Sequence, residues 1–193
     1  MSQIAQQSGY LKTICESLTE HLDSLPGDAR TQIGFIAYNS AVHFYSIADS
    51  FNQPHEITVV DIEDPFLPCP DNLLINLKEC KELIKDLLVQ LPIRFANEHD
   101  PHSALGAALQ VAFKMMQQSG GRVTVFQTCL PNIGPGALQS RENPNERSAK
   151  DIHHLGPATD FYKRLALECS GQQIAVDLFL LNSQYSDLST LGE

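Results

Sequence analysis

The sequence predicts an α/β protein in which a mainly parallel β-sheet lies between layers of helices. Its clearest strand is Arg122–Leu130 (RVTVFQTCL), which is rich in β-branched residues and lies between Gly120–Gly121 and Pro131. A helical pattern precedes this strand and a long polar loop follows it. Because buried strands alternating with helices are the repeating unit of such sheets, we expect Arg122–Leu130 to be the central strand.

The first part of the chain predicts a helix, a hairpin and a further strand. Apolar residues recur at helical spacing over Gly9–Leu25. Thr31–Tyr38 and Val42–Ile47 have strand composition and are separated by a short Asn-Ser turn, so we expect an antiparallel hairpin at one edge of the sheet. Glu56–Ile62 is a further short strand.

The second part alternates helices with strands. Leu73–Leu91 carries apolar residues at helical spacing, and Asp100–Pro101 has the composition of an N-cap followed by a first-turn proline. After the Arg122–Leu130 strand, Ala158–Cys169 predicts a short helix, with Phe161, Leu165 and Cys169 facing inward. The last predicted elements are a strand buried on both faces, Gln173–Leu181, and the start of a helix within Tyr185–Leu191.

The long connection Pro131–Pro157 combines turn residues and charges with few apolar anchors. Loops of this length are usually functional or mobile. We therefore expect it to be the least ordered internal segment, with trypsin cutting first near Arg141 or Arg147.

Composition excludes several classes of protein. The 193 residues predict one domain, 1–193, and a net charge of −10 disfavours a nucleic-acid partner or unaided binding to anionic lipid. No stretch approaches the ~18 apolar residues of a membrane span, and the start lacks the pattern of a signal peptide. An odd number of scattered cysteines favours a reducing compartment over disulfides or zinc. These are Cys15, Cys69, Cys80, Cys129 and Cys169.

Helices alternating with strands around one antiparallel hairpin suggest a von Willebrand factor A-like, three-layer fold. Six segments then resemble, in order and over nearly the whole chain, the trunk domain of the cargo-binding adaptor of the inner COPII vesicle coat. The A/B type of paralogue is a closer match than the C/D type. The segments are Pro26–Tyr45, Asp61–Pro68, Asn72–Cys80, His102–Gln110, Gly120–Leu138 and Pro157–Leu191.

The resemblance implies an interaction scaffold and not an enzyme. Its expected partner is the paralogous GTPase-activating subunit of the coat, and the full-length adaptor would select membrane cargo. We expect a cytoplasmic location at the cytosolic face of endoplasmic-reticulum exit sites, with peripheral and indirect membrane association. The family's zinc-binding module, β-sandwich, helical region and gelsolin-like module are not found in this sequence, so no cofactor is expected here.

The resemblance also implies a missing strand. In the family an apolar strand precedes the first helix, and Met1–Ser2 aligns with its last two residues. The first strand, central in this fold, is therefore expected to be absent, and Glu193 has the appearance of a cut end.

Four groups of residues are candidates for chemistry. A von Willebrand A domain can hold a divalent cation with Asp, Ser and Thr oxygens, but only Ser2 and Ser103 resemble such ligands, and Thr128–Asn132 supplies no Asp. Cys129 with His153–His154 in the next loop lacks a triad or nucleophile-elbow motif. Gly134-Pro135-Gly136 lacks the Lys-Ser/Thr of a phosphate loop, and Met115–Met116 predicts core packing. We therefore expect no catalytic, metal or cofactor residues.

Four functions remain open at this point. The coat scaffold is the first and a metal-dependent ligand-binding domain the second, which calcium or magnesium titration would distinguish. A hydrolase using Cys129 or a serine is the third, testable with activity probes. The last is the GTPase-activating paralogue itself, which the segments containing QTCLP and PATDFYKRLAL fit less well.

Overall fold

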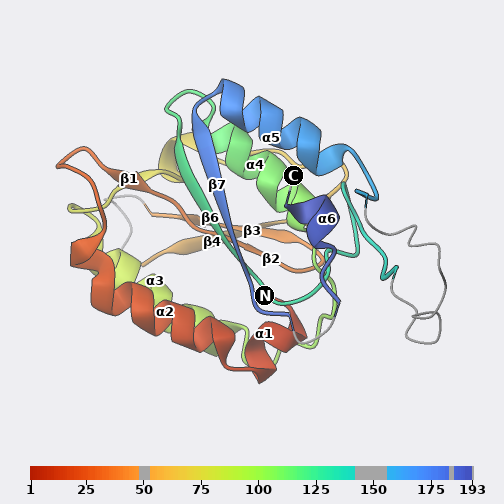
Figure 1. The fold of residues 1–193 in the computed structure, drawn as a ribbon. Coiled ribbons are helices and arrows are strands. Elements are labelled where there is room, and N and C mark those ends of the chain that lie inside the picture. Colours follow the sequence, from red (N-terminus) through yellow and green to blue (C-terminus); the bar gives the residue numbers. More distant parts are fainter. Residues whose placement is uncertain (48–52, 142–155, 183–184, 193) are drawn as a thin grey trace.

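The computed structural model describes residues 1–47, 53–141, 156–182 and 185–192. Strands form a middle layer, with α4 and α5 on one side and α2 and α3 on the other (Figure 1). The helices are α1 (Gln3–Gln7), α2 (Tyr10–His21), α3 (Lys81–Arg94), α4 (Leu105–Met116), α5 (Phe161–Gly171) and α6 (Leu188–Leu191). The strands are β1 (Gln32–Ile33), β2 (Ile36–Tyr38), β3 (Val42–Ser46), β4 (His55–Val59), β5 (Ile75–Asn76), β6 (Gly121–Gln127) and β7 (Ile174–Leu180).

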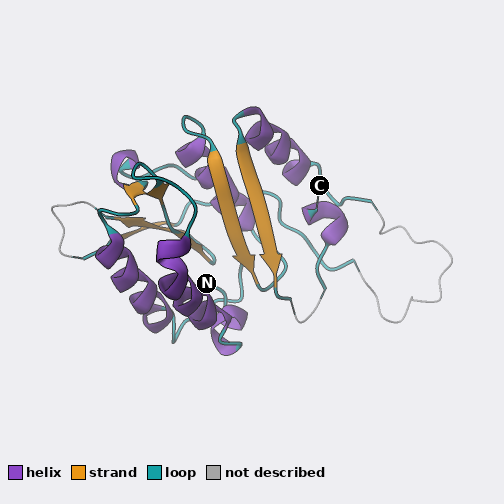
Figure 2. Ribbon diagram, turned by 60° about the vertical axis from the view of Figure 1, so that its left-hand side comes forward, coloured by secondary structure: helices purple, strands orange, loops and turns teal. Residues whose placement is uncertain are grey.

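The strands of the described residues form three small sheets rather than one. β1 pairs with β5, and β2–β3–β4 form a second sheet, all through antiparallel ladders. β6 and β7 form the third sheet through a parallel ladder, in register from Gly121 opposite Ile174 to Gln127 opposite Leu180. Figure 2 shows this parallel pair apart from the smaller strands. The prediction of one mainly parallel sheet is therefore wrong for the described strands. Most of their ladders are antiparallel, and no backbone pairing joins β6 to the antiparallel strands.

The predicted hairpin is confirmed, but its first strand is shorter than expected. β2 and β3 pair with Tyr38 opposite Val42. The predicted strand Thr31–Tyr38 divides at Gly34 because its first half pairs with β5 instead. A Cβ at Gly34 would lie 2.6 Å from the Leu73 carbonyl oxygen, so the backbone is closely packed at this break. β4 pairs antiparallel with β3, which makes this half of the molecule more antiparallel than predicted.

Helix α3 begins later than the apolar pattern predicts. Leu73 and Leu77 lie before it, in a stretch that contains a 3-10 turn and β5. The Asn76 side chain accepts the backbone N–H groups of Lys78 and Glu79 at 2.9 and 3.1 Å, which favours a turn over a helix at this point. The later apolar positions are confirmed as a buried face. They are Ile84, Leu87, Leu88 and Leu91.

Asp100 is not the N-cap of the following helix. Helix α4 begins at Leu105 with Ala104 in the capping position. The Asp100 carboxylate instead accepts the backbone N–H groups of His102 and Ser40, each at 2.9 Å. Asp100 therefore ties the approach to α4 to the β2–β3 turn, a role that local sequence did not indicate.

Strands β6 and β7 are less enclosed than predicted. Among the described strands β6 pairs only with β7, so β6 has one hydrogen-bonded neighbour. The prediction that it is a central strand is therefore wrong for the described sheets. β7 was expected to be buried on both faces. Ile174 is buried, whereas Phe179 is 53% exposed and stacks on Phe126 with ring centroids 5.5 Å apart. Tyr10 of α2 packs edge-on against Phe126, with ring centroids 6.4 Å apart.

The remaining helices mostly follow the predicted patterns. A short α1 precedes α2, and Leu11, Cys15 and Leu22 are buried as expected of the first amphipathic segment. In α5, Leu165 and Cys169 are buried. Of the long Pro131–Pro157 connection, residues 142–155 lie outside the described part of the chain, and so do Arg147 and His153–His154. That this loop is the least ordered internal segment, and that trypsin cuts it first, stay predictions.

Candidate functional sites

A groove lies between strands β2 and β6. Its volume is about 620 Å³, and its walls comprise the backbone segments 32–38 and 122–129 together with side chains of α2 and α4. The Tyr38 hydroxyl donates to Gln127 Oε1 at 2.5 Å, which joins the last residues of both strands at one end of the groove. Along the described strands no backbone hydrogen bond bridges β2 and β6, so each presents a free edge to the groove.

The first two residues close that same end. The Met1 amine donates to the Tyr38 carbonyl oxygen, and Ser2 Oγ lies 3.0 Å from Thr128 Oγ1. Burial disfavours the charged ammonium and lowers the pKa of the Met1 amine to about 6. The amine therefore lies near the ends of β2 and β6, where it donates a hydrogen bond to the backbone of β2.

The hydroxyl groups considered as metal ligands lie near this end but are bonded to one another and to amides. Gln127 Nε2 donates to Ser103 Oγ at 2.9 Å, and the Ser103 N–H donates to Asn132 Oδ1 at 2.9 Å. Within the described ranges, no three His, Cys, Asp or Glu side chains gather where they could hold a metal ion. A site made of hydroxyls and amides alone suits a hard cation poorly.

The other candidate residues do not assemble into a reactive site in the described structure. Cys129 is half-buried, no described histidine hydrogen-bonds to it, and His153–His154 lie outside the described residues. Gly134 and Gly136 have φ of +70° and +71°, and the Leu138 N–H donates to the Pro131 carbonyl oxygen at 2.7 Å. The Gly-Pro-Gly segment is thus a tight turn, as predicted.

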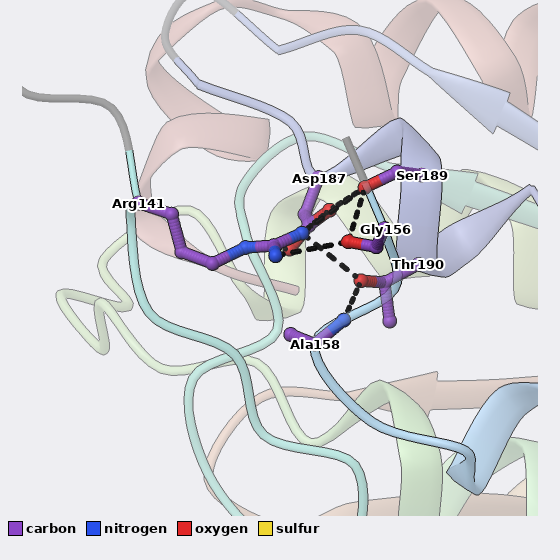
Figure 3. A network of polar contacts seen from close by, with 6 residues as sticks. All are labelled: Arg141, Gly156, Ala158, Asp187, Ser189 and Thr190. Carbon is purple, nitrogen blue, oxygen red and sulfur yellow. Dashed lines mark hydrogen bonds and ion pairs between the residues drawn. The ribbon is translucent and has the colours of Figure 1, made fainter. Parts of the chain in front are cut away.

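A polar network that the sequence analysis missed surrounds Asp187, whose side chain is 1% exposed (Figure 3). Arg141 donates two hydrogen bonds to this carboxylate, from Nε to Oδ2 at 2.9 Å and from Nη2 to Oδ1 at 2.7 Å, and so forms a bidentate ion pair. Burial acts to raise the pKa of Asp187, but hydrogen bonds from Arg141, Ser189 and Thr190 outweigh it, and the pKa is lowered.

The same network fixes the chain on either side of the 142–155 segment. Arg141 Nη1 donates to the Gly156 carbonyl oxygen at 2.9 Å, and the Ala158 N–H donates to Thr190 Oγ1 at 2.8 Å. Each of its residues looks ordinary in sequence, and the 46 positions between Arg141 and Asp187 give no spacing signal. The contacts fasten α6 to the loop ends, which is a structural role.

These features define a class of protein. The described residues form an α/β scaffold with an apolar groove bounded by strand edges, and its polar clusters are hydrogen-bonded within themselves. None of the helices in the described part of the chain is long and apolar enough to cross a membrane.

Comparison with known proteins identifies the family. The model of the Sec23/Sec24 trunk domain matches residues 1–193, and the chain belongs to this family. It is 62% identical to human "Protein transport protein Sec24B" over 193 residues, which cover 100% of this chain and 15% of that protein. It is 58% identical to human Sec24A, with 100% of this chain and 18% of that protein covered.

A solved structure gives the same result. The human COPII-coat protein Sec24c superposes with a TM-score of 0.91 at 32% identity, covering 99% of this chain and 26% of that one. The predicted resemblance to the coat adaptor trunk is confirmed, including the closer similarity to the A/B type. The chain spans less than a fifth of the length of these curated relatives, which are protein transport proteins.

Proposed function

We propose that this chain is the trunk of a COPII cargo adaptor and acts there as an interaction scaffold. The observation that carries this proposal is the match of the family model to all 193 residues. We assign it one partner, the paralogous GTPase-activating subunit of the inner coat. Contact with membrane cargo would come through the rest of a full-length adaptor.

The proposed location follows from this role. We place the protein in the cytoplasm, at the cytosolic face of endoplasmic-reticulum exit sites and COPII vesicles. Its net charge of −10 supports peripheral and indirect membrane association, because anionic lipid would repel it, and argues against nucleic acid as a partner. The proposed scaffold role requires no enzymatic activity, and we propose no metal and no other cofactor for this chain.

We further propose that residues 1–193 belong to a single von Willebrand A-like domain, and that the first strand of this fold is not among these residues. The groove between β2 and β6 supports this, because its two walls are strand edges ending side by side. A strand placed there would join β2 and β6, turning the antiparallel strands and the parallel pair into one sheet. The layers of helices above and below the strands also suit this arrangement (Figure 1).

Binding to the purified GTPase-activating paralogue tests the proposed role. We expect surface plasmon resonance to detect a saturable complex with the chain, and tighter binding when the chain carries an apolar N-terminal extension that fills the groove. A matched control extension with serine at every second position would not tighten it. Absence of binding with every version would contradict the role, and binding only after addition of calcium or magnesium would favour the metal-dependent alternative.

A further inference from the structure

A buried histidine in the antiparallel sheet contacts three elements at once. His43 lies in β3 and is 8% exposed, and the Phe95 ring at the end of α3 packs edge-on against its imidazole, with centroids 5.4 Å apart. The imidazole Nδ1 lies 3.0 Å from Glu56 Oε1 and 3.0 Å from Thr58 Oγ1, both on β4. Its Nε2 lies 3.1 Å from Asn39 Oδ1 in the β2–β3 turn. Each ring nitrogen therefore has an oxygen partner inside the protein.

The hydrogen bonds of Asn39 determine where the neutral imidazole carries its hydrogen. Asn39 Oδ1 also accepts the Ala41 N–H at 3.0 Å, so this atom is the amide oxygen and His43 Nε2 must donate to it. Nδ1 of the neutral ring is then an acceptor, and the Thr58 hydroxyl is its donor. The ionised Glu56 carboxylate has no hydrogen to donate. Its oxygen and Nδ1 therefore face each other with no hydrogen between them.

A proton on Nδ1 would satisfy that contact without any movement of the backbone. The new N–H would donate to Glu56 Oε1, and the Thr58 hydroxyl, 3.3 Å from the same oxygen, would turn from the ring to the carboxylate. Burial opposes the charged ring more strongly than Glu56 favours it, so the pKa of His43 lies below its ordinary value. The ring is therefore neutral at pH 7 and takes up its proton in mild acid.

Among the described residues, the charged and titratable groups around His43 belong to β4, the N-terminus, α3 and β3. Glu56 on β4 attracts the added proton, whereas the Met1 amine and Arg94 of α3 repel it. Tyr45, two residues along β3, keeps an uncharged hydroxyl because burial raises its pKa. The single carboxylate in this set is thus the group that decides how the added charge is compensated.

Arg94 shares that carboxylate with His43. Arg94 Nε forms an ion pair with Glu56 Oε2, and the Glu56 side chain is 9% exposed whereas that of Arg94 is 57% exposed. Once His43 is a cation, it neutralises the carboxylate from the other oxygen and repels the guanidinium. Arg94 can then move into water at little cost. Because Arg94 is the last residue of α3, its release loosens the turn in which the Phe95 N–H donates to the Leu91 carbonyl oxygen.

We infer that His43, Glu56 and Arg94 form an acid-sensitive switch at the end of helix α3, in which protonation of His43 replaces the Glu56–Arg94 ion pair by a Glu56–His43 pair and loosens the last turn of the helix. Because burial makes the closed form bind this proton less readily than an open form, proton uptake favours opening. The closed form is fully stabilised above the ordinary histidine pKa of about 6.5, and this stabilisation is lost as the pH falls below it. The switch goes beyond the proposed coat role, since it requires no coat subunit.

The protonation of His43 can be measured directly. The exchange rate of the imidazole C2 hydrogen follows the charge of the ring, so mass spectrometry over a pH series gives the midpoint for His43 in the unmodified chain. We expect a midpoint below about 6.5. Thr58→Val removes the hydroxyl that serves the neutral ring and should raise the midpoint by about half a pH unit or more, whereas the matched control Thr58→Ser should leave it unchanged. A midpoint above the ordinary value, or equal shifts in both variants, would overturn the inference.

Backbone hydrogen exchange measures the opening itself. The Phe95, Ala96 and Glu98 amides are hydrogen-bonded in the closed turn, and we expect their protection to fall roughly threefold or more between pH 7.5 and pH 5.5, after correction for the chemical exchange rate. Amides in the middle of α4 should keep their protection. Unchanged protection at the end of α3, or an equal loss in α4, would contradict a local switch.

Two variants and a matched control assign the effect to these side chains. His43→Gln cannot take up a proton and should abolish the pH dependence at the end of α3, whereas His21→Gln, at an exposed histidine of α2, should retain it. Arg94→Gln, at an exposed position, removes the ion pair and should leave the turn open already at pH 7.5. Circular dichroism shows whether His43→Gln is folded, and if it is not, Arg94→Gln decides. A pH dependence that survives in either variant would overturn the inference.

Discussion

The two halves of the strand layer differ in how completely they are enclosed. In the antiparallel half, every residue of β3 is buried, and Val42 and Phe44 are 0% exposed. In the parallel half, β6 borders the groove and β7 leaves Phe179 53% exposed. The difference shows that apolar, β-branched sequence makes a strand but does not bury it, because burial requires a neighbour on each side.

The largest expected effect concerns the open half. Unpaired strand edges lined with apolar side chains are templates for association. We expect the chain alone to be poorly soluble or self-associating, and an N-terminal extension that supplies an apolar strand to convert it into a monomer. Sedimentation velocity measures this, and a stable monomer that the extension leaves unchanged would show that the groove is closed in another way.

The next prediction compares one aromatic residue from each half. Phe44→Ala in the closed half should lower the free energy of unfolding by about 3–5 kcal/mol, because it removes a fully buried ring. Phe179→Ala in the open half should cost less than about 1 kcal/mol, since half of its ring already contacts water. Urea melts of the extended, monomeric protein give both values, and similar losses would mean that the halves are equally enclosed.

A smaller effect is expected on the helical layer beneath the strands. Leu87 is 4% exposed, and Leu87→Ala should cost roughly 2–5 kcal/mol. Lys85, on the polar face of the same helix, pairs with Glu82 near the surface, and Lys85→Ala should cost less than about 0.5 kcal/mol. Equal losses in urea melts would contradict the assigned helix face.

Disrupting the Asp187 network should cost less than Phe44→Ala or Leu87→Ala. Asp187→Asn keeps the shape but weakens the charged bonds to Arg141, and we expect a loss of about 1–3 kcal/mol. Because the pKa of Asp187 is lowered in the folded protein, its contribution is present above the ordinary carboxyl pKa of about 3.9 and is lost as the pH falls below it. Urea melts at pH 7 and pH 3 should therefore differ more for the unmodified chain than for the variant.

Local patterns were sufficient for several elements. The hairpin followed from two strand-forming runs around Asn39–Ser40, and the buried face of α3 followed from the spacing of Ile84, Leu87 and Leu91. These predictions succeeded because period and turn chemistry are properties of neighbouring residues. The start of α3 was wrong because β5 pairs with β1, a contact that the helical spacing of Leu73 and Leu77 cannot reveal.

The sequence by itself determined the family, the helix faces, the hairpin and the absence of a recognisable metal or catalytic motif. Only the tertiary structure decided which strands pair, where Asp100 bonds, and that Arg141 meets Asp187. Those outcomes depend on contacts between residues far apart in the chain. The groove is the clearest case, because its apolar walls come from segments about 90 residues apart that become neighbours only in the folded chain.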